Sequence, residues 1–335
     1  MAKTVTFVKD TANVFFHLLT QCNLACRHCY INPQQHGTQR LPIDRIQIWL
    51  EILIRRSPTA NLIFLGGEPT LHPDLATAAK SARKLGYASI TIDTNGYLFN
   101  DILDKVTPHE VDVFSFSLDG PTAAINDAIR GQGCFQHCTA GIQQAKSRGF
   151  GISLIYTVSS RNLSYLEKMV PLLQQWGIDH FFIQVIGLRG KSAGVTSISK
   201  EDAPLQVSRE QWLRVVPPVA RQVTAAGIRV TYPKVYLGPE EQFECAGRVA
   251  DNYFVFPNGR VYRCPLCEDF PMHSLAFSDD GLVDAGPINE ADLFKLDIAE
   301  GCVMNKLIQP RNLAYLPDGS PAYKIACCLL KEQIE

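Results

Sequence analysis

Four glycines interrupt the middle of this sequence at equivalent points, each after a helical pattern and before a β-rich stretch. They are Gly86, Gly149, Gly177 and Gly227. Glycine accepts the left-handed backbone conformation that commonly ends a helix. The repeated order of strand, helix, glycine and strand predicts parallel βαβ units and a sheet covered by helices.

Six stretches rich in Val, Ile and Phe supply the expected strands. They are residues 14–19, 62–65, 89–93, 111–118, 152–158 and 181–186. Six parallel strands are too few for an eight-stranded barrel, so we expect an α/β fold with an open sheet or a partial barrel. In either arrangement the chemistry belongs at the C-terminal ends of the strands.

The sequence changes character after residue 237, where helical periodicity fades and Gly, Pro, Asp and Cys become frequent. We therefore expect two domains, residues 1–237 and 238–335, with a boundary near Gly238–Pro239. Asn258 and Gly259, between β-rich flanks, predict a hairpin turn in the second domain. In the first domain, Ser208 and Gln211 predict a capping box at the start of a helix.

Charge and cysteine content limit the functional classes. The 32 basic and 33 acidic side chains leave a net charge of −1, which gives no electrostatic reason to expect nucleic acid or an anionic membrane as partner. No apolar run approaches the roughly 20 residues that span a bilayer, and the N-terminus does not resemble a secretory signal. We expect a cytoplasmic protein, in which 11 cysteines more often bind metal or do chemistry than form disulfides.

Three of these cysteines, Cys22, Cys26 and Cys29, directly follow the first expected strand. Thiolates this close together can surround one metal centre, and cysteine is the usual ligand of iron–sulfur clusters. Three ligands on a cluster of four irons leave one iron open to an exchangeable ligand. A structural zinc site completed by His28 or His36 is an alternative, as are three incidental buried cysteines.

The spacing Cys-x3-Cys-x2-Cys, with the aromatic His28 before the last cysteine, resembles the signature of the radical S-adenosylmethionine superfamily. The resemblance covers roughly residues 12–190 and implies a partial (β/α)6 barrel with a [4Fe-4S] cluster after the first strand. It also implies S-adenosylmethionine as cofactor and places Tyr30, after the last cysteine, beside it.

Three further motifs follow later strands and strengthen the resemblance. Gly66-Gly67-Glu68-Pro69 follows the second strand, where two glycines allow a ligand to approach the backbone closely; in the family this segment binds the methionyl amino group. Thr94 and Asn95, in Asp-Thr-Asn-Gly, follow the third strand and would lie beside the cofactor. The fourth strand ends in Ser-Leu-Asp-Gly, and the resemblance assigns cofactor contacts to Ser117, Asp119 and Arg130.

A second group of cysteines occupies the last third of the chain. Its members are Cys245, Cys264, Cys267, Cys302, Cys327 and Cys328. Their pattern is similar to the Twitch and SPASM extensions of this superfamily, and the missing dense cysteine run favours the Twitch type with one auxiliary [4Fe-4S] cluster. Cys245, Cys264 and Cys267 are the expected ligands, with a fourth from Cys302, Cys327 or Cys328. An auxiliary zinc site is the alternative.

The resemblance implies reductive cleavage of S-adenosylmethionine to a 5′-deoxyadenosyl radical, with an electron from a ferredoxin or flavodoxin. The radical would abstract a hydrogen atom from a peptide or a small biosynthetic substrate. Alternatives are a tetrapyrrole or sugar substrate, methyl or aminocarboxypropyl transfer without that radical, and a non-catalytic zinc-binding scaffold. Cys134 and Cys138 could donate a hydrogen atom to a substrate radical, although ordinary packing residues are commoner at such positions.

Overall fold

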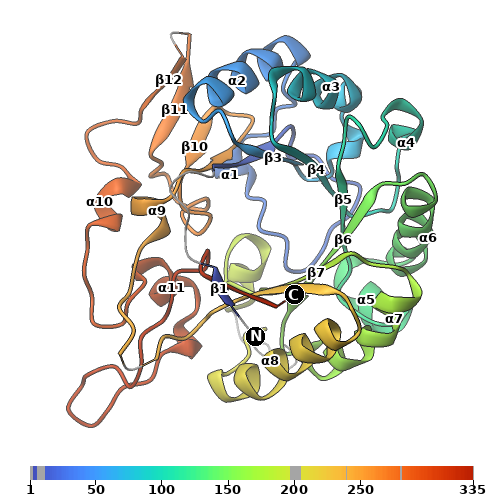
Figure 1. Ribbon diagram of the computed structural model, residues 1–335. Helices are drawn as coiled ribbons and strands as arrows, with labels where there is room; N and C mark the ends of the chain where they lie inside the picture. The colour runs from blue at the N-terminus through green and yellow to red at the C-terminus, as the bar shows by residue number, and fades with distance from the viewer. Residues whose placement is uncertain (1–2, 6–11, 197–204, 239, 280, 335) are drawn as a thin grey trace.

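The computed structural model describes residues 3–5, 12–196, 205–238, 240–279 and 281–334. Within these residues one sheet of 13 strands runs in the order β1-β13-β8-β7-β6-β5-β4-β3-β2-β9-β10-β11-β12. Its central strands curve around a common axis, and the longer helices lie outside them (Figure 1). The expected partial barrel of parallel strands is therefore confirmed.

Seven consecutive strands of the barrel are parallel. They are β2 (Asn13–His17), β3 (Asn61–Leu65), β4 (Ser89–Thr94), β5 (Val113–Ser117), β6 (Gly151–Val158), β7 (His180–Val185) and β8 (Arg229–Pro233). The first six match the predicted strands. β8 was not among them, although it follows Gly227, which the sequence places before a β-rich stretch.

Helices connect these strands on the outside. The longer ones are α2 (Ile43–Arg56), α3 (Leu75–Leu85), α5 (Ala123–Arg130), α6 (Cys134–Ser147), α7 (Met169–Gln175) and α8 (Arg209–Ala225), and short helices are α1 (Pro33–His36) and α4 (Ile102–Lys105). The four predicted glycines have φ between 65° and 90°, which is the left-handed region expected of them. The capping box of Ser208 and Gln211 at the start of α8 is also confirmed.

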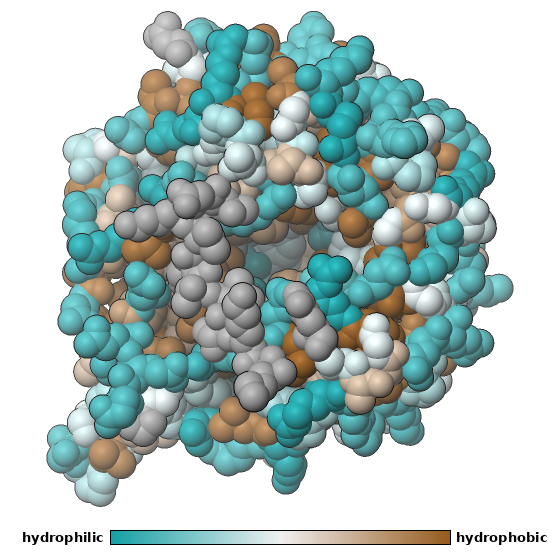
Figure 2. All heavy atoms as spheres, in the orientation of Figure 1, coloured by the Kyte–Doolittle hydropathy of each residue, from teal (hydrophilic) through white to brown (hydrophobic). Residues whose placement is uncertain are grey.

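Alternation along the strands separates the core from the barrel interior. Phe16, Phe64, Ile92, Phe114 and Leu154 are fully buried between the sheet and the helices. The alternate positions of the same strands face the other way, toward the barrel axis, because successive strand side chains point to opposite faces. In the space-filling view the surface is hollowed near the middle of this ring (Figure 2).

The segment after residue 237 joins both open edges of the parallel sheet. Its strands are β9 (Asn252–Val255), β10 (Arg260–Tyr262), β11 (Leu275–Ser278), β12 (Gly281–Asp284) and β13 (Lys331–Ile334), and its helices are α9 (Ala246–Val249), α10 (Glu290–Phe294) and α11 (Val303–Ile308). β9 pairs in parallel with β2, whereas β13 pairs with β8 and with β1 (Lys3–Val5). The predicted hairpin at Gly259 joins β9 to β10. The predicted domain boundary is near Gly238–Pro239, and Pro239 lies outside the described residues.

Candidate active site and cysteine cavity

The three N-terminal cysteines lie on the loop between β2 and α1, which we call the cysteine loop (residues 18–32). Their thiols are free and partly exposed. Backbone hydrogen bonds hold the loop against the sheet: Gly67 N donates to the Leu19 carbonyl at 2.9 Å, and Arg27 N donates to the Ile129 carbonyl at 3.1 Å. The loop is thus attached both to the end of β3 and to α5.

Gly66 and Gly67 are required by the close approach of the cysteine loop. A Cβ atom on Gly67 would lie 2.3 Å from the Gln21 carbonyl oxygen, and one on Gly66 would lie 2.7 Å from the Leu19 carbonyl oxygen. Both neighbours are backbone atoms, which have no alternative rotamer. The sequence pattern predicted that a ligand approaches the backbone at these glycines. In the structure the segment that approaches them is the cysteine loop.

Glu68 links the ends of β3 and β4 from a fully buried position. Its carboxylate accepts hydrogen bonds from Thr70, from the Thr94 hydroxyl at 2.8 Å and from the Asn95 backbone N–H at 2.8 Å. Burial raises the pKa of this carboxyl, and these donors oppose the rise. Asn95 then continues to the cysteine loop, where its side-chain amide donates to Asn23 Oδ1 at 2.8 Å.

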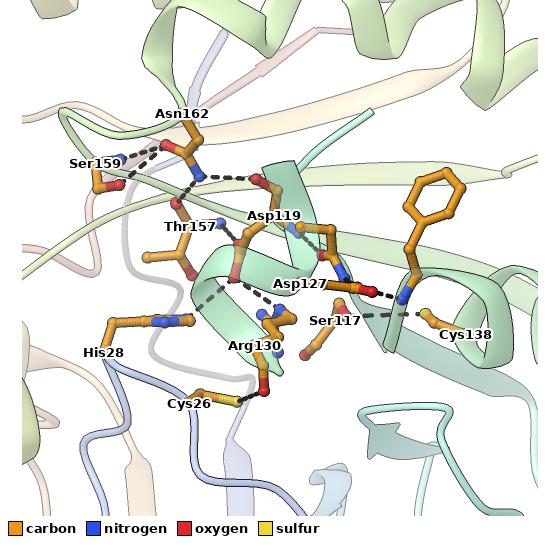
Figure 3. Close-up of polar contacts among 12 residues, drawn as sticks. Cys26, His28, Ser117, Asp119, Asp127, Arg130, Cys138, Thr157, Ser159 and Asn162 are labelled. Atoms are coloured by element: carbon orange, nitrogen blue, oxygen red, sulfur yellow. Dashed lines mark hydrogen bonds and ion pairs between the residues drawn. The ribbon is translucent and has the colours of Figure 1, made fainter. Parts of the chain in front are cut away.

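Asp119 provides a second attachment, beyond the end of β5 (Figure 3). Its buried carboxylate lies 2.7 Å from the Arg130 guanidinium and 3.2 Å from His28 Nε2. Burial would raise the pKa of Asp119, but Arg130 and His28 outweigh it and hold the pKa at about 2. The Arg130 carbonyl oxygen accepts a hydrogen bond from the Cys26 thiol at 3.6 Å. The Asp119 carboxylate therefore contacts His28 of the cysteine loop directly and Cys26 of the same loop through Arg130.

Tyr30 is engaged by protein side chains. Its hydroxyl lies 2.7 Å from His17 Nε2, and the Arg189 guanidinium covers its ring at 4.7 Å. Arg189 also lies 2.9 Å from the Glu268 carboxylate, whose pKa burial raises to about 8 despite the arginine. Neither Arg189 nor Glu268 was among the predicted site residues, although Glu268 directly follows Cys267 in the sequence.

Ser117 ends β5 on the face that points into the barrel, and its carbonyl oxygen lies 3.8 Å from the Cys138 thiol. Cys138 and Cys134 belong to α6, outside the sheet, and both are buried. Cys138 is part of the main hydrophobic core. The structure therefore gives these two thiols packing contacts and does not expose them to the barrel interior.

Asp93 is a barrel-facing carboxylate within the Asp-Thr-Asn-Gly motif that sequence reasoning did not single out. Its register partner on β5 is Ser115, and its Oδ1 atom is buried without a hydrogen-bond partner among the described residues. Burial, and then the nearby Glu68, raise the pKa of Asp93 to about 7. Asp93 can therefore hold or release a proton near neutral pH.

The C-terminal cysteines converge on one cavity beside α9, α10 and α11, which we call the cysteine cavity. Those that line it are Cys245, Cys264, Cys302, Cys327 and Cys328. Cys267 lies next to Cys264, close enough for the two thiols to hydrogen-bond. The remaining wall is mostly apolar, with Leu266, Phe294 and Met304.

Both cysteine sets fit an iron–sulfur group by the chemistry of their donors, since thiolates in partly desolvated surroundings are the usual cluster ligands. In the cysteine loop, Asn23 Nδ2 and His28 Nδ1 are buried without a partner among the described residues. Anywhere in the described residues, no three His, Cys, Asp or Glu side chains are gathered in metal-binding geometry. The ligand sets therefore remain predictions.

Comparison with known proteins identifies related sequences and folds. A profile of the Radical SAM superfamily matches residues 17–173. The chain is 33% identical over 181 residues to pre-heme d1 synthase of Dinoroseobacter shibae, covering 53% of this chain and 44% of that protein. It is 26% identical over 275 residues to the mycofactocin maturase MftC of Mycobacterium tuberculosis, covering 81% and 68%.

Among solved structures, Streptococcus suis SuiB bound to the precursor peptide SuiA has the same fold, with a TM-score of 0.60. The identity is 14%, and the match covers 87% of this chain and 66% of SuiB. The match to the Dinoroseobacter protein described above spans less than half of that protein's length. In the described part of the chain, no helix has the length and apolar composition needed to cross a membrane.

Proposed function

Since this chain belongs to the radical S-adenosylmethionine superfamily, we propose that it cleaves S-adenosylmethionine reductively and abstracts a hydrogen atom from a peptide or a small biosynthetic substrate. One observation carries the proposal. The cysteine loop is attached to the motifs after β3, β4 and β5 through Gly67, Asn95 and Asp119. Three thiols are thereby held at the C-terminal edge of a parallel sheet, where such folds bind ligands.

Cys22, Cys26 and Cys29 would hold a [4Fe-4S] cluster, with one iron left for the cofactor. When bound, the cluster and S-adenosylmethionine supply a 5′-deoxyadenosyl radical, while the protein supplies position and exclusion of water. Gly66, Gly67, Glu68 and Pro69, with Thr94, Asn95 and Ser117, would line the cofactor site.

Asp119 and Arg130 would act mainly by positioning. The Asp119 carboxylate and the Arg130 guanidinium form an ion pair with each other at 2.7 Å. Asp119 also orients His28 in the cysteine loop. Tyr30 would act in the same way, because its hydroxyl and ring are engaged by His17 and Arg189.

The cysteine cavity would hold one auxiliary [4Fe-4S] cluster, as in Twitch-type extensions. Cys245, Cys264 and Cys267 are the proposed ligands, with a fourth from Cys302, Cys327 or Cys328. Five cysteines line one mostly apolar cavity and Cys267 lies beside one of them, Cys264, which supports this assignment. The electron donor would be a ferredoxin or flavodoxin.

A peptide is the favoured substrate class. MftC is named a maturase, and the SuiB structure contains a precursor peptide. The pre-heme d1 synthase relative supports the tetrapyrrole alternative.

The deciding experiment is anaerobic reconstitution with iron and sulfide, followed by dithionite and S-adenosylmethionine. We expect about eight irons per chain for two four-iron clusters, and formation of 5′-deoxyadenosine. Replacing Cys22, Cys26 and Cys29 by Ala should remove about half of the iron and abolish 5′-deoxyadenosine. Replacing Cys264 and Cys267 should remove the other half.

The alternatives give different results in the same assay. About two zincs, with no cleavage of S-adenosylmethionine, would identify a metal-binding scaffold and overturn the proposal. Methyl or aminocarboxypropyl products without 5′-deoxyadenosine would retain the cofactor and overturn the radical assignment. As a matched control, the buried packing residue Cys138 replaced by Ala should keep its iron.

A further inference from the structure

In one sector of the barrel, four strands carry no inward-pointing acidic side chain among the described residues. The register from β6 through β7 and β8 to β13 places Ile155, Phe182, Thr231 and Gln333 on one face. Lys331 is two residues from Gln333 and therefore shares this face. The only acid in these four strands, Glu332, points to the opposite face and lies 3.7 Å from Lys234.

Lys331 sits at the end of the barrel that holds the cysteine loop. It is paired with Pro233, the last residue of β8, because β13 is antiparallel to β8. The C-terminal ends of parallel strands lie together, so Lys331 is at the same edge as Ser117 and Thr94. An amine at this edge faces the space in which a substrate would meet the cofactor.

The ammonium group of Lys331 has no counter-ion in the described part of the chain. Its nitrogen lies 5.1 Å from the centre of the Phe182 ring, a cation–π distance, and no carboxylate of the described residues forms an ion pair with it. Burial lowers the pKa of this amine, and the Cys328 and Cys327 thiols oppose that effect. Lys331 does not line the cysteine cavity, although two cysteines of that cavity act on its amine. The Phe182 ring that it contacts is on the barrel face, because Phe182 is in register with Ile155.

A half-buried cation without an acid is costly unless a ligand supplies the negative charge. The neutral polar groups on the same face, including Thr157, Gln184 and Thr231, can hydrogen-bond to a ligand but cannot neutralise the amine. An aromatic ring below the ammonium keeps it in place and leaves its N–H donors for an acceptor in the barrel.

We propose that Lys331 binds an anionic group of the substrate, a carboxylate or a phosphate, at the mouth of the barrel. The inference rests on the proposed function for the identity of the ligand as substrate. The chemistry of the site, however, is tested without knowing that substrate. It narrows the substrate class to molecules that present an acid group near the hydrogen atom to be abstracted.

The test uses the reconstituted holoenzyme and measures acetylation of individual lysines by mass spectrometry, with succinate and methylphosphonate as the two probes. At about ten times its dissociation constant, a bound anion should slow labelling of Lys331 about tenfold. Lys295, which is exposed on the surface, is the matched control and should react at the same rate with and without the probe. Protection by succinate alone indicates a carboxylate substrate, and protection by methylphosphonate alone indicates a phosphorylated one.

A variant of Lys331 separates this inference from the proposed function. Lys331→Met should keep its iron and its substrate-free formation of 5′-deoxyadenosine. If the wild-type enzyme forms no 5′-deoxyadenosine but Lys331 is protected, the proposed function fails and the anion site stands. Equal protection of Lys295, no protection of Lys331, no labelling of Lys331 at all, or loss of iron in Lys331→Met would each overturn the anion site.

Discussion

The Arg189 guanidinium lies 2.9 Å from the carboxylate of Glu268, although the two residues are 79 positions apart in the chain. The same guanidinium covers the ring of Tyr30. Tyr30 follows Cys29, and Glu268 follows Cys267. Arg189 therefore contacts one residue that adjoins the cysteine loop cysteines and one that adjoins the C-terminal cysteines. A displacement of either set of cysteines should shift the other through this arginine.

A double-mutant cycle with Arg189→Gln and Glu268→Gln tests this link. We expect a coupling of about 1–3 kcal/mol in the free energy of unfolding, because Arg189→Gln removes the guanidinium that the buried Glu268 side chain contacts at 2.9 Å. Denaturant unfolding of the four proteins gives the value. The exposed pair Glu51 and Arg55 on α2 is the control, with about 0.3–0.5 kcal/mol. A coupling no larger than the control would argue against the link.

Asp119→Asn should destabilise the protein by about 3–5 kcal/mol, since it leaves the buried Arg130 without its partner. The carboxylate has a lower pKa in the folded protein, about 2, than in the unfolded chain, about 3.9. Its stabilising contribution is therefore complete above pH 4 and is lost as the pH falls toward 2. Urea unfolding near pH 7 measures the loss. Asp104→Asn, at an exposed ion pair, should change stability by less than about 0.5 kcal/mol, and equal effects would contradict the assignment.

Gly67→Ala should displace the cysteine loop, because the added Cβ meets the Gln21 carbonyl at 2.3 Å. We expect a loss of about 1–3 kcal/mol in stability from overpacking. The reconstituted variant should also lose about half of its iron, from the cysteine loop and not from the cavity. Gly238→Ala is the control, since the atom nearest to its added Cβ is a side-chain oxygen of Glu241 at 3.0 Å and not a backbone atom. Full iron content in Gly67→Ala would show that the loop tolerates the shift.

Asp93→Asn should alter the pH dependence of stability. The pKa of Asp93 is about 7 in the folded protein and about 3.9 when unfolded, so folding takes up a proton between these values. The wild-type contribution of this group therefore becomes less favourable as the pH rises from 4 to 7. The free energy of unfolding of the variant minus that of the wild type should therefore increase by on the order of 2 kcal/mol between pH 5 and pH 8. A difference in stability that stays constant over this range would refute the raised pKa.

The repeated glycines and the Val, Ile and Phe stretches were sufficient to predict β2 to β7 and the position of the cysteine loop. These signals are local, because each depends on a few adjacent residues. Local signals also place Glu68 and Asn95 after neighbouring strands, where parallel pairing brings them together. The ordering of the barrel was predictable for the same reason.

The remaining contacts join residues far apart in the sequence. Arg130 and Tyr30 were expected to touch the cofactor, but the partners that engage them, Asp119 and Arg189, become apparent only in three dimensions. The attachment of β13 to β8 had no sequence signal either, since Lys331–Ile334 contains one apolar residue. Cysteine spacing likewise could not tell which thiols share the cavity, because Cys245 and Cys327 approach it from different elements.

The pairing of β13 with β8 also has a consequence for how the chain folds. Pro233 ends β8 and Lys331 begins β13, so 97 residues intervene before the outer edge of β8 finds its partner. Pairings of such long sequence separation form late. Until then β8 presents a row of unpaired backbone groups, which is a template for association with other chains. Solubility during synthesis should therefore depend on a four-residue strand that lies far from β8 in the sequence.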